Sequence, residues 1–227
     1  MIDRRQFLLA TASVFLSGRA FAISGNSVNW STFHAQMTAL AEEEARQQVT
    51  QKEVAELGVQ YLRNLDINTA EFKTAIADAY ESGNRYWLWQ RMMKEQNING
   101  GILNIDSHQL VTLHDHPGAT GVIRIISGET EVWQFDEVAS TNAEAGVTQL
   151  QRVSHRVLKV GDMAVLNPHK GNIHALRAMN GECRMLDFFI PPYQSSQRNW
   201  FEPLEANWFN EEKIACRKIP QHAFTDA

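Results

Sequence analysis

The chain has 227 residues, of which 44% are hydrophobic and 21% charged, and its formal net charge is −5. This length suits one compact domain with an added segment, because single domains commonly run to about 100–200 residues, and it argues against two separate large cores. The composition is that of an ordinary soluble globular protein. The chain has no long basic run and no alternation of basic and aromatic residues, which argues against nucleic acid as a partner.

The first 22 residues, MIDRRQFLLATASVFLSGRAFA, have the pattern of a targeting segment. Arg4 and Arg5 precede a short apolar run from Phe7 to Leu16, and Ala20-Phe21-Ala22 supplies a small-x-small cleavage site. The run is shorter than the roughly 20 residues that span a bilayer, so we expect no membrane span. The arrangement resembles a twin-arginine export signal, which implies the twin-arginine export machinery as a partner and a periplasmic mature protein. A frayed terminus is the alternative.

Residues 23–97 are predicted to form a helical N-terminal region. From Trp30 to about Gln96 the pattern is helical, with few β-branched residues. Thr50-Gln51-Lys52-Glu53 and Asn68-Thr69-Ala70-Glu71 have the form of capping boxes, in which a side-chain oxygen and a glutamate satisfy reciprocal amides, so we expect two helix starts there. Four large side chains near the end of the region could form an aromatic box, but their place in a helical segment favours residues that pack against the barrel: Trp87, Trp89, Met92 and Met93.

After residue 97 the pattern changes to short, β-branched runs bounded by Gly, Pro or Asn, such as GVIRIISG, HRVLKVGDMAVLNP and CRMLDFFIPP. About eight such strands, with turn signals every ten or so residues, are typical of a small sandwich or jelly-roll barrel whose interior can house a ligand. We therefore expect residues 98–227 to form a β-barrel.

The chain contains two cysteines, Cys183 and Cys216. Two cysteines provide no disulfide framework for the fold. An oxidising compartment could join them, and their spacing does not say whether they meet. We expect them to be unpaired.

The segment LVTLHDHPGATGVIRIISG, residues 110–128, carries two histidines at alternate positions before a Pro-Gly turn. In a strand, residues i and i+2 face the same side, so His114 and His116 should project together while Asp115 turns away. A third histidine, His174, lies near the start of a later strand pattern. Imidazole is the commonest metal ligand among side chains, and three imidazoles leave coordination positions open for chemistry. The alternative is a barrel in which the imidazoles are only hydrogen-bonded.

These segments resemble the two cupin motifs. HDHPGATGVIRIISG has the His-x-His pair and the closing Gly128 of the first motif, with Gly121 at the position that glutamate often holds. PHKGNIH, residues 168–174, resembles the second motif. With Leu186-Asp187 and Pro191-Pro192-Tyr193 added, roughly residues 100–205 look like the cysteamine dioxygenase and plant cysteine oxidase family of thiol dioxygenases.

The resemblance implies a mainly β fold, the cupin double-stranded β-helix or jelly-roll barrel, preceded by an α-helical layer. It implies non-haem Fe(II) held by His114, His116 and His174, and an enzyme that adds both atoms of O2 to a small-molecule thiol to give a sulfinic acid. Without a glutamate at position 121, three neutral imidazoles leave the double positive charge of the metal uncompensated, which favours a thiolate ligand. Cysteamine, cysteine and the N-terminal cysteine of a peptide are the candidate thiols.

The resemblance extends to three further positions. Asp187 matches an aspartate associated with activity, and we expect it to accept a hydrogen bond from a ligand imidazole. Tyr193 matches a tyrosine that could donate to bound oxygen or substrate, with a packing role as an equal alternative. Arg124 shares the strand parity of Val122 and Ile126 and matches a basic residue of the family, which makes it a candidate substrate contact.

Two other functions fit the same motifs, because cupins support many chemistries. One is a three-histidine lyase or isomerase that uses manganese, zinc or nickel. The other is a cupin without enzymatic activity that binds a small ligand or a metal. Oxygen uptake distinguishes the dioxygenase from both.

Overall fold

The structure is a computed structural model, and it describes residues 27–82, 85–86, 88–93, 95–139, 146–192 and 197–223. The export signal predicted for residues 1–22, the predicted packing residue Trp87 and the predicted catalytic Tyr193 lie outside the described residues. Within those ranges, no helix combines the length and the apolar character that a membrane span requires.

Three α-helices come first among the described elements: α2 (Trp30–Ala45), α3 (Gln51–Asn64) and α4 (Ala70–Glu81). The strands follow: β1 (Arg85–Tyr86), β2 (Trp89–Met93), β3 (Asn99–Ile105), β4 (Leu110–His114), β5 (Thr120–Ser127), β6 (Glu129–Val138), β7 (Val147–Lys159), β8 (Met163–Leu166), β9 (Ile173–Ala178), β10 (Cys183–Ile190), β11 (Asn199–Pro203) and β12 (Lys213–Pro220). Two short 3-10 helices, η2 (Trp208–Asn210) and η3 (Gln221–Ala223), flank β12.

One of the two predicted capping boxes is confirmed. The Thr50 hydroxyl accepts from the Glu53 amide and the Glu53 carboxylate accepts from the Thr50 amide, which starts α3 as expected. At α4 the N-cap is Thr69 rather than the residue before it, and its hydroxyl accepts from the Phe72 amide at 3.2 Å. The second box was therefore wrong by one residue. The glutamate that would have closed it, Glu71, instead accepts a hydrogen bond from the Ser31 amide at the start of α2.

The prediction of helix as far as Gln96 is correct to Glu81 and wrong beyond it, because β1 and β2 follow. A short apolar run such as WLWQRMM fits a buried strand as well as a buried helix, and tertiary pairing decides between them. Here β2 pairs antiparallel with β3, with Trp89 opposite Leu103. The Trp89 ring also lies against Gly101, where an added Cβ would be 2.4 Å from the indole. This close approach requires glycine.

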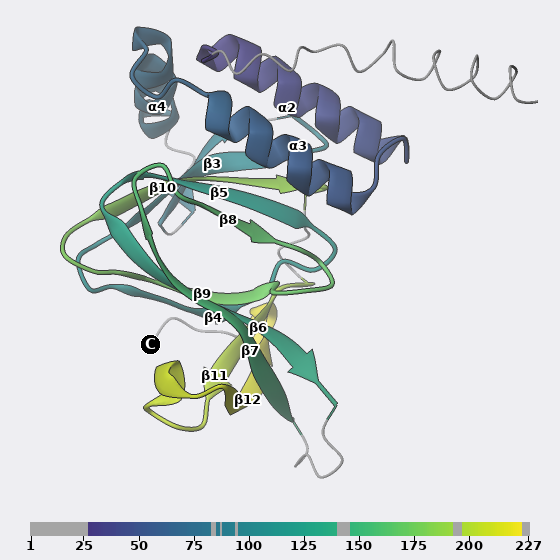
Figure 1. Cartoon of the computed structure of the whole chain (residues 1–227), viewed down its shortest axis with the longest axis vertical. Coiled ribbons are helices and arrows are strands. Elements are labelled where there is room, and N and C mark those ends of the chain that lie inside the picture. The colour runs from purple at the N-terminus through teal and green to yellow at the C-terminus, as the bar shows by residue number, and fades with distance from the viewer. Residues whose placement is uncertain are drawn as a thin grey trace, which may run out of the picture.

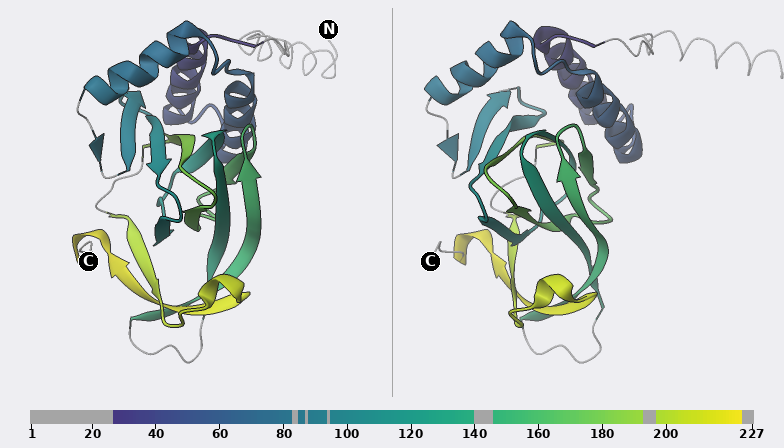
Figure 2. Two further views of the ribbon diagram at one scale, coloured as in Figure 1. Left: turned by 90° about the vertical axis from the view of Figure 1, so that its left-hand side faces the viewer. Right: turned by 60° about the vertical axis from the view of Figure 1, so that its left-hand side comes forward.

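The strands form two sheets (Figure 1). The first has six strands in the order β1-β2-β3-β10-β5-β8, and the second has the order β11-β12-β7-β6-β9-β4 and closes through the pair Trp200–His114. Neighbouring strands in both sheets are antiparallel. The helices cover the outer face of the first sheet, and β11 and β12 lie at the opposite end of the molecule (Figures 1 and 2). Among the described residues, the fold is a mainly β barrel of two antiparallel sheets preceded by three helices, which agrees with the predicted architecture.

Strand β10 shows how the two faces of the first sheet divide the core. Met185 and Phe189 point into the barrel and belong to the cluster between the sheets, whereas Leu186 and Phe188 pack against the helices. Because side chains alternate along a strand, Asp187 shares the inward face with Met185 and Phe189. This alternation places a carboxyl group inside an apolar barrel.

The two cysteines are unpaired, as predicted, and both are buried. Burial raises the pKa of Cys183 to about 12, with the neighbouring Glu182 adding to the effect. Burial also raises the pKa of Cys216 to about 12. At neutral pH both are thiols, and thiols are less reactive than thiolates.

Candidate metal centre

An irregularity in β4 directs His114 into the barrel. The pairing of β4 with β9 sets Val111 opposite Leu176 and His114 opposite His174, so β4 carries one extra residue between these two pairs. Val111 faces the interior, and regular alternation would send Leu113 after it. Because of the bulge, Leu113 packs instead in a separate hydrophobic cluster with Trp133 and Phe135, and the His114 side chain points into the barrel.

The structure brings the three predicted histidines together. One ring nitrogen from each of His114, His116 and His174 lies within 4.8 Å of the others. All three residues are buried, with 2–5% of their surface exposed. The ring centroids are 4.9 Å apart for the first two, and these lie 4.3 and 5.2 Å, respectively, from that of His174. The strand parity and the pairing of β4 with β9 therefore produce one cluster of nitrogen donors.

Main-chain carbonyls orient two of these rings. The Nδ1 of His114 lies 2.8 Å from the carbonyl oxygen of Thr112, and the Nδ1 of His174 lies 2.8 Å from that of Asn172. A carbonyl only accepts, so these contacts assign the proton to Nδ1 and leave the Nε2 lone pair for a metal.

Burial keeps the imidazoles neutral. It lowers the pKa of His174 to about 4, although the hydrogen bond to Asn172 opposes this shift. Burial also places the pKa values of His114 and His116 well below the usual value, and the other histidines and Arg198 add to this effect. A neutral imidazole is the form that binds a metal. The donor set therefore fits a divalent transition-metal ion.

A side-chain amide holds His116 in place. The Oδ1 of Asn172 accepts from the His116 amide at 2.7 Å, and its Nδ2 donates to the His116 carbonyl at 3.0 Å. The carbonyl of the same asparagine orients His174. One residue thus fixes two members of the cluster.

The position that usually carries the cupin glutamate is filled by an aromatic ring. A Cβ added at Gly121 would lie 2.6 Å from the Phe189 ring and 3.1 Å from Leu166. The Phe189 ring in turn packs on His116, with centroids 4.1 Å apart. The Phe189 ring therefore occupies the space that a side chain at position 121 would need. Glycine at this position leaves the three histidines as the donors of the cluster.

Gly121→Ala should destabilise the metal-free protein by about 1–3 kcal/mol, because the added methyl group overpacks the Phe189 ring. Pushing Phe189 against His116 should also weaken metal binding, by roughly 10-fold. Urea denaturation and metal titration of Gly121→Ala, Phe189→Leu and the double variant measure both effects. Because a leucine side chain in place of the ring leaves room for the methyl group, the double variant should be more stable than the sum of the single changes predicts. Strictly additive effects would contradict this contact.

A pocket inside the barrel opens onto the histidines, and its lining is Trp89, Leu103, Val111, His114, His116, Ile123, His174, Leu176, Asp187 and Arg198. Asp187 is 8% exposed, and its Oδ1 has no hydrogen-bond partner within the part of the chain that the structure describes. Burial raises the pKa of Asp187 to about 8, while Arg198 acts in the opposite direction. The expected hydrogen bond from a ligand imidazole is absent for His114 and His174, because their Nδ1 atoms go to main-chain carbonyls.

Arg124 is not in this pocket. Its Nη1 donates to the carbonyls of Leu62 and Leu65, both at 2.7 Å, at the C-terminal end of α3. The parity with Val122 is correct, but that side of β5 faces the helices. The predicted substrate contact is therefore corrected: Arg124 caps a helix, where a cation satisfies the last carbonyl groups.

Arg198 is a pocket residue that the sequence motifs did not predict. It precedes β11, is 6% exposed, and places its Nη2 3.4 Å from the Nδ1 of His116. Its guanidinium also lies over the Trp200 ring, 5.5 Å from the centroid. The sequence signal was a single cation in the otherwise uncharged stretch QSSQRNW.

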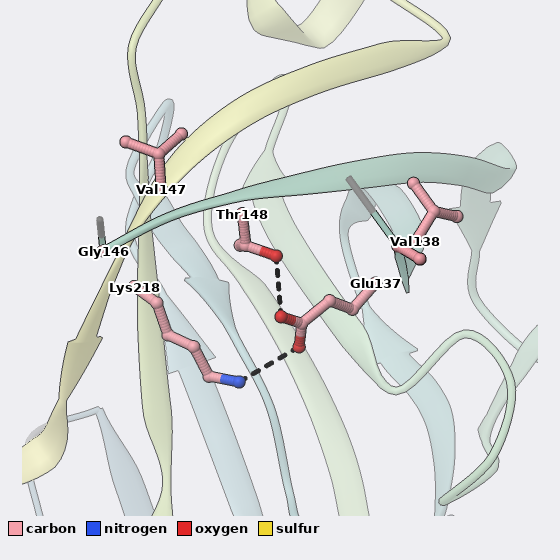
Figure 3. A pocket seen from close by; sticks show the side chains of 7 residues that line it. Glu137, Val138, Gly146, Val147, Thr148 and Lys218 are labelled. Carbon is pink, nitrogen blue, oxygen red and sulfur yellow. Dashed lines mark hydrogen bonds and ion pairs between the residues drawn. The ribbon is translucent and has the colours of Figure 1, made fainter. Parts of the chain in front are cut away.

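A second pocket lies at the far end of the β6–β7 hairpin (Figure 3). Its polar groups satisfy one another: Thr148 donates to the Glu137 carboxylate at 2.6 Å, and the Lys218 ammonium lies 3.0 Å from it. Because Glu137 is paired with Thr148 and Lys218, this pocket does not offer a group of metal-binding side chains like the three histidines inside the barrel.

The curated relatives are dioxygenases. The chain is 26% identical over 125 residues to the 2-aminoethanethiol dioxygenase of Mus musculus, a match that covers 46% of this chain and 48% of that protein. It is 23% identical over 114 residues to the Homo sapiens protein of the same name, covering 41% and 42%. The matches span about half the length of these relatives.

Two solved structures show a partial similarity to the chain. A protein with a double-stranded β-helix domain from Klebsiella pneumoniae is 18% identical with a TM-score of 0.35, covering 45% of this chain and 75% of that one. A cupin superfamily protein from Desulfitobacterium hafniense is 18% identical with a TM-score of 0.34, covering 46% and 76%. The PCO_ADO family model matches residues 59–224, a range that contains all three histidines and most of the described chain. The chain therefore belongs to the PCO_ADO family, that of cysteamine dioxygenase and plant cysteine oxidase.

Proposed function

We propose that this protein is an Fe(II)-dependent thiol dioxygenase that converts a small thiol, or an N-terminal cysteine, to a sulfinic acid. The observation that carries the proposal is the cluster of three buried, neutral imidazoles in a barrel that has no carboxylate beside them at position 121. Membership of a family of thiol dioxygenases supports it. The overall reaction balances without a further reductant, because a thiolate and O2 together give a sulfinate.

The residues of the chain have distinct parts in this proposal. The Nε2 atoms of His114 and His174, held by their main-chain contacts, and one nitrogen of His116 would bind the ion. When bound, a ferrous ion supplies the redox chemistry and favours the thiolate form of a sulfur ligand. Apolar side chains, among them Val111, Ile123 and Leu176, line the rest of the pocket and exclude water.

Oxygen consumption and product mass test the proposal. The protein, loaded with Fe(II) under anaerobic conditions, should consume one O2 per thiol and yield a product heavier by two oxygen atoms. Loading with zinc should give no oxygen uptake. A three-histidine lyase or isomerase would transform a substrate without oxygen uptake, and a binding cupin would be stabilised by its ligand without forming a product. Either result would overturn the proposal.

A further inference from the structure

We infer that Arg198 binds an anionic group on the substrate, so that the preferred thiol carries a carboxylate rather than an ammonium group. This inference rests on the proposed function, because it concerns the substrate of the same site. It specifies which chemical class of thiol the site prefers. The relatives named 2-aminoethanethiol dioxygenase are only 26% and 23% identical, and this identity does not decide the substrate.

The first observation is the position of the guanidinium. Arg198 lines the pocket with the three histidines, and its Nη2 is 3.4 Å from the His116 ring. A substrate bound through sulfur at the cluster would therefore lie beside this side chain. The short separation calls for a small molecule in which only a few bonds join the thiol and the anionic group.

The second observation is the way the chain fixes Arg198. The Asp115 carboxylate accepts from the Asn199 amide at 2.7 Å and from its Nδ2 at 2.9 Å, and the Asp115 amide donates to the Asn199 carbonyl at 3.1 Å. On the other side, the Arg198 carbonyl accepts from the Gln221 amide at 3.0 Å. The middle residue of the His-Asp-His motif thus ties Arg198 to the histidine pair. These bonds fix the main chain at Arg198. The guanidinium itself is buried and lies over the Trp200 ring, 5.5 Å from the centroid. A guanidinium held in this way binds a carboxylate at a lower entropic cost.

The third observation is the charge of the pocket. Among the described residues of the lining, Arg198 carries the one permanent positive charge, and a divalent ion would add two more. Asp187 supplies at most one negative charge even if it is fully ionised. The loaded site therefore has a surplus of positive charge, which attracts an anionic thiol and repels an ammonium group. A guanidinium pairs with a carboxylate through charge-assisted hydrogen bonds.

Three thiols with the same two-carbon chain test the inference: 3-mercaptopropionate, 2-mercaptoethanol and cysteamine. The Fe(II)-loaded protein should give the highest kcat/KM for 3-mercaptopropionate and the lowest for cysteamine. Anaerobic calorimetric titration should show the same order of affinity without turnover. If cysteamine is oxidised most efficiently, the inference is wrong while the proposed function stands. If no thiol is oxidised, the proposed function itself fails.

Variants separate substrate binding from a structural role. Arg198→Gln should lower kcat/KM for 3-mercaptopropionate by roughly 10- to 100-fold, mainly through KM, because a charge-assisted contact is lost. The same change should lower kcat/KM for 2-mercaptoethanol much less than for 3-mercaptopropionate, and Arg198→Lys should recover part of the loss. Arg184→Gln, which removes an exposed arginine paired with Glu182 on the same protein, is the matched control. Equal losses for all three thiols, or no recovery with lysine, would contradict the inference.

Discussion

Replacing His174 with alanine should abolish metal binding and lower sulfinate formation by at least about a thousandfold, because one of three nitrogen donors is removed from the site. The chain is expected to fold, since the loss of the hydrogen bond to the Asn172 carbonyl costs only about 1 kcal/mol. Metal content per chain and oxygen uptake with a thiol measure the effect.

His169→Ala is the matched control for this experiment. His169 lies in the same turn, five residues before His174, but it is exposed and is not part of the cluster. Its removal should leave metal content and turnover unchanged. A His174→Ala protein that keeps one metal per chain and full turnover would refute the assignment of the cluster as the metal site.

Asp187→Asn should change how the stability of the metal-free protein depends on pH. Burial raises the pKa of Asp187 to about 8 in the folded state, against about 3.9 in an unfolded chain. Between these values the folded protein holds a proton that the unfolded chain releases, so the contribution of Asp187 to stability is present at acid pH and is lost as pH rises toward 8. Asparagine cannot ionise and lacks this dependence. From pH 5 to pH 8 the variant should therefore gain on the order of 3–4 kcal/mol relative to the wild type.

Urea denaturation of both metal-free proteins at pH 5, 6.5 and 8 measures this difference. All histidines are the same in both proteins, so their contribution cancels in the comparison. Asp106→Asn, which replaces an exposed aspartate, is the control for the chemical change itself. If the Asp187→Asn curve is parallel to that of the wild type, the carboxyl group is not held in its protonated form.

Local chemistry explains why much of the site could be predicted from the sequence. His114 and His116 stand two residues apart next to a Pro-Gly turn, so strand parity brings these two to one side, and His174 joins them through the pairing of β4 with β9. The bulge in β4 was not predicted, because it depends on the pairing with β9. It nonetheless leaves the parity of the two neighbouring histidines intact.

The errors have a common cause in tertiary packing. The run around Trp89 has no local signal that chooses strand over helix, and its pairing with β3 decides. Strand parity correctly grouped Arg124 with Val122, but parity does not say which side of a sheet faces the barrel and which faces the helices. Arg198 reaches the histidines only because β11 returns to β4, a contact between segments more than 80 residues apart.

X-ray absorption at the iron edge, on protein loaded with one Fe(II) per chain, measures the ligands of the iron. We expect three imidazole nitrogens around the iron and the appearance of one sulfur ligand when a thiol is added in the absence of oxygen. Fewer than three imidazole nitrogens, or a coordination sphere that gains no sulfur with any thiol, would refute the three-histidine iron site.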